Sequence, residues 1–133
     1  MLDPARLHPN LLWTTLLVCV VALLWAAWVA WRQPTTLSTI PEGLRSLCWI
    51  AELLLIAEVI TGGVLWWQGM RPARPEVHLI YAVAATAVLP IAMQRIRGKP
   101  PREGAITLAI LLFLLVALLL RGLSTGRPPL TAA

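Results

Sequence analysis

Residues 48–67 read CWIAELLLIAEVITGGVLWW, an apolar run that is long enough to cross a bilayer and yet carries Glu52 and Glu58. A membrane span needs about 20 mainly apolar residues. An ionised acid at membrane depth costs roughly 2.5 to 3.5 kcal/mol on insertion scales, so each carboxyl group must be protonated, paired or turned toward a polar interior. The run therefore predicts a membrane helix that buries two acids inside a bundle.

The rest of the chain has the same character. Of its 133 residues, 59% are hydrophobic and 13% are charged, whereas soluble domains carry about 25% charged residues. Four apolar runs predict an all-α integral membrane protein, with four transmembrane helices in an up-down bundle joined by short loops. This single membrane domain spans residues 1–133, with helices expected at 10–32, 44–68, 76–94 and 104–121 and a tail at 122–133.

The last two expected helices differ in composition. The third is interrupted by Pro90 and is rich in alanine, and its alanine content favours a central helix that packs closely against its neighbours. Residues 105–120 are almost uniformly aliphatic and are expected to face lipid. The first two helices do not visibly recur in the last two, so no internal repeat is expected.

Tryptophans cluster near the ends of the first two helices, which is typical of the aromatic belts at membrane interfaces. An alternative is a pigment or quinone site on the stripe formed by Trp25, Trp28 and Trp31. Antiparallel helices place one belt at Trp28, Trp31 and Trp49 and the other at Trp13, Trp66 and Trp67.

The formal net charge is +5, and the arginines flank the apolar runs. They can contact anionic lipid headgroups, and no soluble basic face exists to follow a phosphate backbone, so nucleic acid is not an expected partner. We expect a multi-pass protein of a bacterial cytoplasmic (inner) membrane. Basic residues are densest in the third loop, residues 95–104, which favours a cytoplasmic third loop with both termini outside.

Glu58 begins a polar stripe in the second helix. Thr61 and Gly62 follow it by three and four positions on the same face, where another helix can approach closely. Glu52 lies about 9 Å nearer the first loop and about 120° around the helix axis. These residues indicate either a structural interface or steps of a proton path through Glu58.

His8, Glu76 and His78 are expected at one membrane face, because the N-terminus and the second loop lie on the same side of an up-down bundle. Two imidazoles can ligate haem iron or, with a carboxylate, a divalent metal. His8 is expected to precede the first helix, and neither histidine belongs to a spacing motif. Structural hydrogen bonds are the main interpretation, with no bound metal or cofactor, and a haem or chlorophyll-type pigment on His78, with or without His8, is the alternative.

No phosphate-binding loop, nucleophile elbow or zinc-protease motif occurs in the sequence, so no catalytic residue is assigned and an enzyme is not expected. The first functional hypothesis is a small accessory or assembly subunit of a larger bacterial membrane complex, respiratory or photosynthetic, which packs against other membrane subunits. The alternatives are a membrane redox protein of electron transport that binds haem or pigment through His78, and a small proton-linked carrier that uses Glu58.

Overall fold

The computed structural model describes residues 3–32 and 37–126, and this part of the chain contains helices and no strand. Each helix is long and apolar enough to cross a membrane, which confirms the predicted all-α membrane fold. The four helices are α1 (Pro4–Arg32), α2 (Glu42–Trp67), α3 (Pro75–Arg95) and α4 (Pro101–Gly126).

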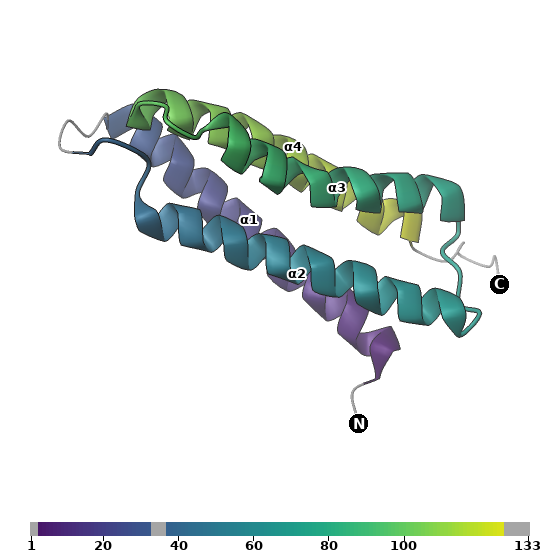
Figure 1. Cartoon of the computed structure of the whole chain (residues 1–133). Coiled ribbons are helices and arrows are strands. Elements are labelled where there is room, and N and C mark those ends of the chain that lie inside the picture. The colour runs from purple at the N-terminus through teal and green to yellow at the C-terminus, as the bar shows by residue number, and fades with distance from the viewer. Residues whose placement is uncertain (1–2, 33–36, 127–133) are drawn as a thin grey trace.

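The helices run up and down in one bundle (Figure 1). α1 packs along both α2 and α4, and α3 packs along α4, whereas α2 and α3 contact each other much less. The bundle is therefore two helix pairs, α1 with α2 and α3 with α4, joined through the α1–α4 seam and parted between α2 and α3. The start of α1, the α2–α3 loop and the end of α4 share one end of the bundle, as the sequence predicted.

The seam between α1 and α4 follows a spacing of three and four residues. α1 buries small side chains along it, including Ala22 and Ala26, and α4 buries Leu108, Leu112 and Leu115 in the same core cluster. Small side chains allow close approach of membrane helices, and the leucines fill the space opposite them. The seam therefore holds the two helix pairs together.

Two expectations about individual helices are wrong. α3 is not the central packing helix: it has the least contact with the rest of the bundle, and Ile80 and Val83 on it are strongly exposed. α4 is not simply lipid-facing, because it buries one leucine stripe while Ile110 and Phe113 point outward. Overall composition misled here because the side chains that recur on one face decide which helix is central.

The first helix begins six residues earlier than expected. Asp3 caps it, with Oδ1 accepting a hydrogen bond from the Ala5 backbone N–H at 3.0 Å, and Pro4 occupies the first helical position. Both residue types are favoured there, the first as an acceptor and the second because its missing N–H needs no partner. His8 therefore lies within the helix and not before it, and Pro9 is accommodated in the second turn.

The fourth helix is also longer than expected at both ends. It starts at Pro101 and continues to Gly126, so residues 122–126 of the expected tail are helical, and Thr125 is buried. These added residues pack beside the start of α3, where Gly122 and Thr125 contact His78. The remaining tail residues, 127–133, lie outside the described part of the chain.

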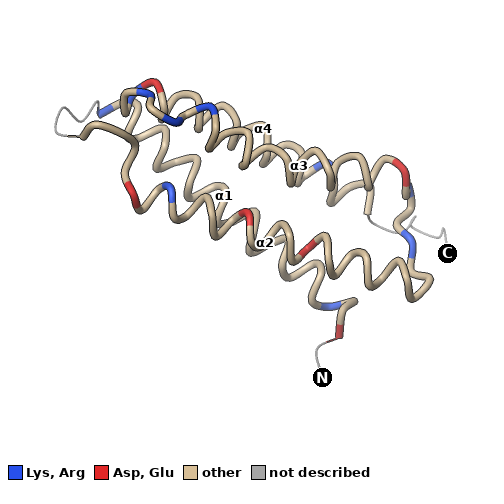
Figure 2. Tube along the Cα trace, in the orientation of Figure 1, with Lys and Arg blue, Asp and Glu red and all other residues tan. Residues whose placement is uncertain are grey.

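Charge is distributed as a membrane protein requires. Lys and Arg lie toward the ends of the bundle, while two acidic positions, Glu52 and Glu58, interrupt the middle of α2 (Figure 2). Large apolar side chains are exposed along all four helices, which suits contact with lipid. All six belt tryptophans are exposed.

Candidate functional site

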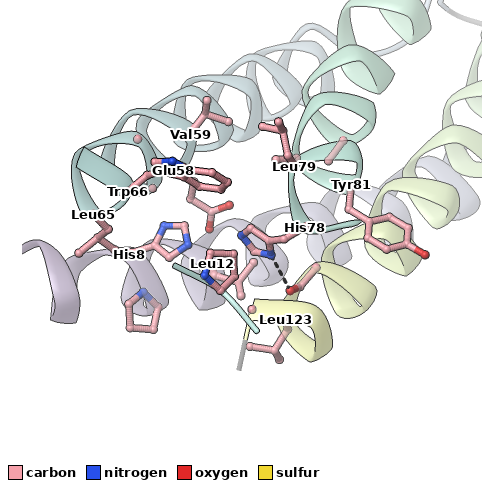
Figure 3. Close-up of a pocket in the computed structure, with 18 of the residues that line it drawn as sticks. His8, Leu12, Glu58, Val59, Leu65, Trp66, His78, Leu79, Tyr81 and Leu123 are labelled. Carbon is pink, nitrogen blue, oxygen red and sulfur yellow. Dashed lines mark hydrogen bonds between the residues drawn. The ribbon is translucent and has the colours of Figure 1, made fainter. Parts of the chain in front are cut away.

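A pocket of about 740 Å³ opens at the end of the bundle that carries the α2–α3 loop. All four helices line it, and it occupies the space where the two helix pairs part. Its lining is mostly apolar, with a few polar side chains that converge: His8, Glu58 and His78 (Figure 3). Small-molecule sites have this character and volumes of about 300 to 1,000 Å³.

His8 reaches the pocket from α1 and is held by α2. Its Nδ1 lies 3.3 Å from the Thr61 hydroxyl oxygen. That hydroxyl also lies 2.9 Å from the carbonyl oxygens of Ala57 and Glu58, toward which its own proton points. We therefore assign the ring proton to Nδ1, which donates to Thr61, and this leaves a lone pair on His8 Nε2.

His78 reaches the pocket from α3 and is held by α4 in the same way. Its Nδ1 lies 3.2 Å from the Gly122 carbonyl oxygen and 3.4 Å from the Thr125 hydroxyl oxygen. A carbonyl oxygen can only accept, so Nδ1–H is the donor and Nε2 again carries the lone pair. The backbone carbonyl of Gly122 thus fixes the tautomer of His78, and together with the position of His78 in α3 it fixes the orientation of the ring.

The two imidazole rings lie opposite each other in the pocket, in an edge-on arrangement (Figure 3). Their centroids are 6.4 Å apart and their planes cross at 68°. No hydrogen bond to either Nε2 occurs among the described residues. A metal–imidazole bond is about 2.0 Å long and the centroid lies roughly 1 Å behind the ligating nitrogen, so two imidazoles on opposite sides of one ion have centroids about 6 Å apart.

Glu58 adds a buried acid to the same space. Its side chain is 7% exposed, and within the described chain its Oε1 is buried without a hydrogen-bond partner. In Figure 3 its carboxyl group points toward the two histidine rings. A buried polar atom without a partner costs free energy, and Glu52 carries such an oxygen as well, so both acids of α2 have an unmet hydrogen-bonding requirement within the described chain.

Two glycines make room for the rings. A Cβ on Gly62 would lie 3.4 Å from His8 Cε1, and a Cβ on Gly126 would lie 3.0 Å from His78 Cε1. Gly62 was expected to permit close approach of another helix, and the helix that approaches is α1, through His8. The second distance is shorter than normal van der Waals contact, so glycine is needed at position 126 for the observed ring position.

The two helix pairs therefore build equivalent half-sites. In each, the first helix supplies a histidine and the second supplies a Thr-Gly dipeptide, Thr61-Gly62 or Thr125-Gly126, that contacts the ring. The expectation that the chain has no internal repeat is wrong at this level. Sequence analysis missed Thr125 and Gly126, although a signal was present: α2 and α4 both carry Glu-Gly near the start and Thr-Gly near the end.

Other candidate residues lie elsewhere. Glu52 is buried and its Oε2 has no partner among the described residues, but it does not line the pocket. Glu76 is exposed and does not join the histidines. The Trp25 stripe is also outside the pocket, with the Trp25 ring packed over Gly43.

The histidines and acids do not form an ordinary metal centre. Within residues 3–32 and 37–126, no three side chains of His, Cys, Asp and Glu are grouped closely enough to hold a metal ion. The arrangement offers two imidazole ligands on opposite walls of an apolar pocket, and any further ligands must come with the bound group. Comparisons of the chain with known protein families, with curated proteins and with solved structures find no match in any of the three.

Proposed function

We propose that the protein is a haem-binding membrane protein of electron transport, in which His8 and His78 would hold the haem iron through their Nε2 atoms. The observation that carries the proposal is the pair of opposed imidazoles with free Nε2 atoms and a centroid separation of 6.4 Å. Each ring comes from a different helix pair, so a planar group bound between them would lie in the opening where the pairs part.

Haem suits this donor set better than a bare metal ion does. Its macrocycle supplies four nitrogen ligands, so two protein imidazoles complete the coordination of iron. The pocket's volume and apolar lining suit a flat, mostly apolar group. When bound, haem supplies reversible one-electron transfer.

The chain's own residues would hold and tune that group. A hydrogen bond from Nδ1–H fixes the orientation of a ligating imidazole and increases its basicity, and such bonds typically change metal affinity by about 10- to 100-fold. Thr61 and the carbonyl of Gly122 accept these bonds here. The apolar side chains around the rings would exclude water.

A second proposal concerns the setting: the protein works as a subunit of a larger complex in a bacterial cytoplasmic membrane, with both termini outside. A one-electron carrier needs a donor and an acceptor, and the described chain consists of membrane-length helices joined by short connections, with no soluble docking domain. The proton-linked carrier that uses Glu58 stays a prediction.

The experiment that tests both proposals is gentle extraction of the protein from haem-replete cells, followed by absorption spectroscopy and native mass spectrometry. We expect one haem per chain with a low-spin spectrum, because two imidazoles give iron a strong axial field. Larger stoichiometric assemblies are expected in the mass spectra. A folded, colourless protein that takes up no added haem would overturn the haem proposal, and a lone chain or homo-oligomer would overturn the subunit proposal.

Substitution of Gly126 by Ala is expected to weaken haem binding about tenfold. The new methyl carbon would lie only 3.0 Å from His78 Cε1, so the ring would have to move, and its Nδ1 hydrogen bond would be disturbed. The measurement is a haem titration of the purified protein. Gly63→Ala is the matched control: Gly63 also lines the pocket, but its Cβ would meet nothing within 4 Å beyond its own stretch of helix, and it makes no contact with either histidine. Equal affinities for the two variants would show that the contact at Gly126 does not position His78.

A further inference from the structure

Arg71 stands at the mouth of the same pocket, and we infer that it binds a free carboxylate on the edge of the ligand. This inference rests on the proposed haem site and specifies the ligand further. It favours a macrocycle with ionised carboxylate groups, such as the propionates of haem, over a chlorophyll-type pigment whose corresponding group is esterified.

The position of Arg71 supports this role. It belongs to the loop between α2 and α3, where the opening between the helix pairs meets the end of the bundle, and it lines the pocket. Its guanidinium carbon lies 5.5 Å from the centre of the Trp66 ring, which is another lining residue. Stacking on an aromatic face restricts the arginine at modest cost and leaves its N–H edge free to bind an anion.

Charge at this end of the bundle points to the same residue. Arg71 is the one cationic side chain among the described residues that line the pocket. Arg6 and Arg74 share this end of the bundle but do not line the pocket, and Arg6 lies 3.7 Å from the Asp3 carboxylate. Arg71 is therefore the cation placed to meet a group that projects from the pocket.

The chemistry of the two ends of the pocket is complementary to an amphiphilic ligand. The interior has apolar walls and two imidazoles for the centre of a macrocycle, while the mouth has a planar guanidinium that can form two parallel hydrogen bonds with a carboxylate. The carboxylate edge of the ligand would then lie at the surface of the bundle, where it stays hydrated.

The test compares two ligands that differ only in the carboxylates: haem and its dimethyl ester. Each is titrated into the full-length protein and followed at the Soret band. We expect the ester to bind wild-type protein about fivefold more weakly, the modest effect of an exposed ion pair. In Arg71→Gln the preference for haem over the ester should disappear, because only haem loses affinity. Arg71→Lys should retain part of this preference, because lysine keeps the positive charge.

Arg74→Gln is the matched control, since Arg74 lies in the same loop outside the pocket lining and its loss should leave the preference at its wild-type value. If haem and ester bind wild-type protein equally and Arg71→Gln changes neither affinity, the role of Arg71 is overturned while the haem site stands. If neither ligand gives a Soret shift, the haem site itself is overturned and the inference with it. Arg71 is exposed, so its variants are expected to fold.

Discussion

Replacement of His78 by Ala is expected to lower haem affinity by roughly two orders of magnitude, since loss of a mere partner of a ligating histidine already costs about 10- to 100-fold. Any haem that remains should change from low-spin to high-spin iron, because one axial ligand is missing. His8→Ala should have the same effect, given the equivalent half-sites, and the double variant should bind none. Absorption and electron paramagnetic resonance spectra measure both the amount and the spin state.

Tyr81→Phe is the control for these variants, because Tyr81 lines the pocket but supplies no ligand in the proposed site. Its low-spin spectrum should be unchanged. Added imidazole should restore a low-spin spectrum to His78→Ala, which a variant damaged only in its packing would not do. A wild-type spectrum in either single histidine variant would contradict axial ligation by that residue.

Leu112→Ala is expected to lower the free energy of unfolding by about 2 kcal/mol, at the lower end of the range for buried Leu→Ala changes. Leu112 is 0% exposed and belongs to the core cluster in which α4 packs most extensively against α1. In a bilayer the unfolded helices still lie in apolar surroundings, so the loss is mainly of van der Waals contacts that lipid cannot restore around the cavity. Unfolding in mixed micelles, followed by tryptophan fluorescence, measures the change.

Leu114→Ala removes the same atoms two positions further along α4. Leu114 is 47% exposed, on the lipid-facing side, so its truncation should change stability by less than about 0.5 kcal/mol. Because both residues are leucines in one aliphatic run, the comparison measures the effect of burial alone on the free energy of unfolding. If the two variants unfold at the same detergent fraction, the α1–α4 seam does not hold the bundle together as described.

Much of the fold follows from the sequence alone. Apolar runs of membrane length can satisfy their backbone groups only as helices, which determines the class and the number of spans. Short connections then require antiparallel neighbours and place the N-terminus beside the second loop. The cost of burying Glu58 in an apolar run marks it as a residue that faces the interior, and the structure places it there.

The site was only partly visible in the sequence. His8 and His78 were candidates because imidazoles are rare in this chain and lie near the same membrane face, but their spacing says nothing about which ring atoms are free. That depends on Thr61 and on Gly122 with Thr125, which are 53, 44 and 47 residues away from the rings they contact. Glu76 was an equally reasonable candidate, and its position on the outer side of α3 excludes it from the pocket.

Hydrophobicity alone thus determined a membrane bundle of four helices with acids and histidines that require an explanation. The tertiary structure decided which face of each helix turns inward, that α1 and α4, and not α3, form the central seam, and that α2 and α3 part to leave a pocket between two histidines. The physical reason is that transfer into a bilayer depends on the total apolar content of a segment, whereas packing depends on which side chains meet across a helix interface. Those contacts are made between residues far apart in the chain, and the same contacts determine the ring positions on which the proposed haem site depends.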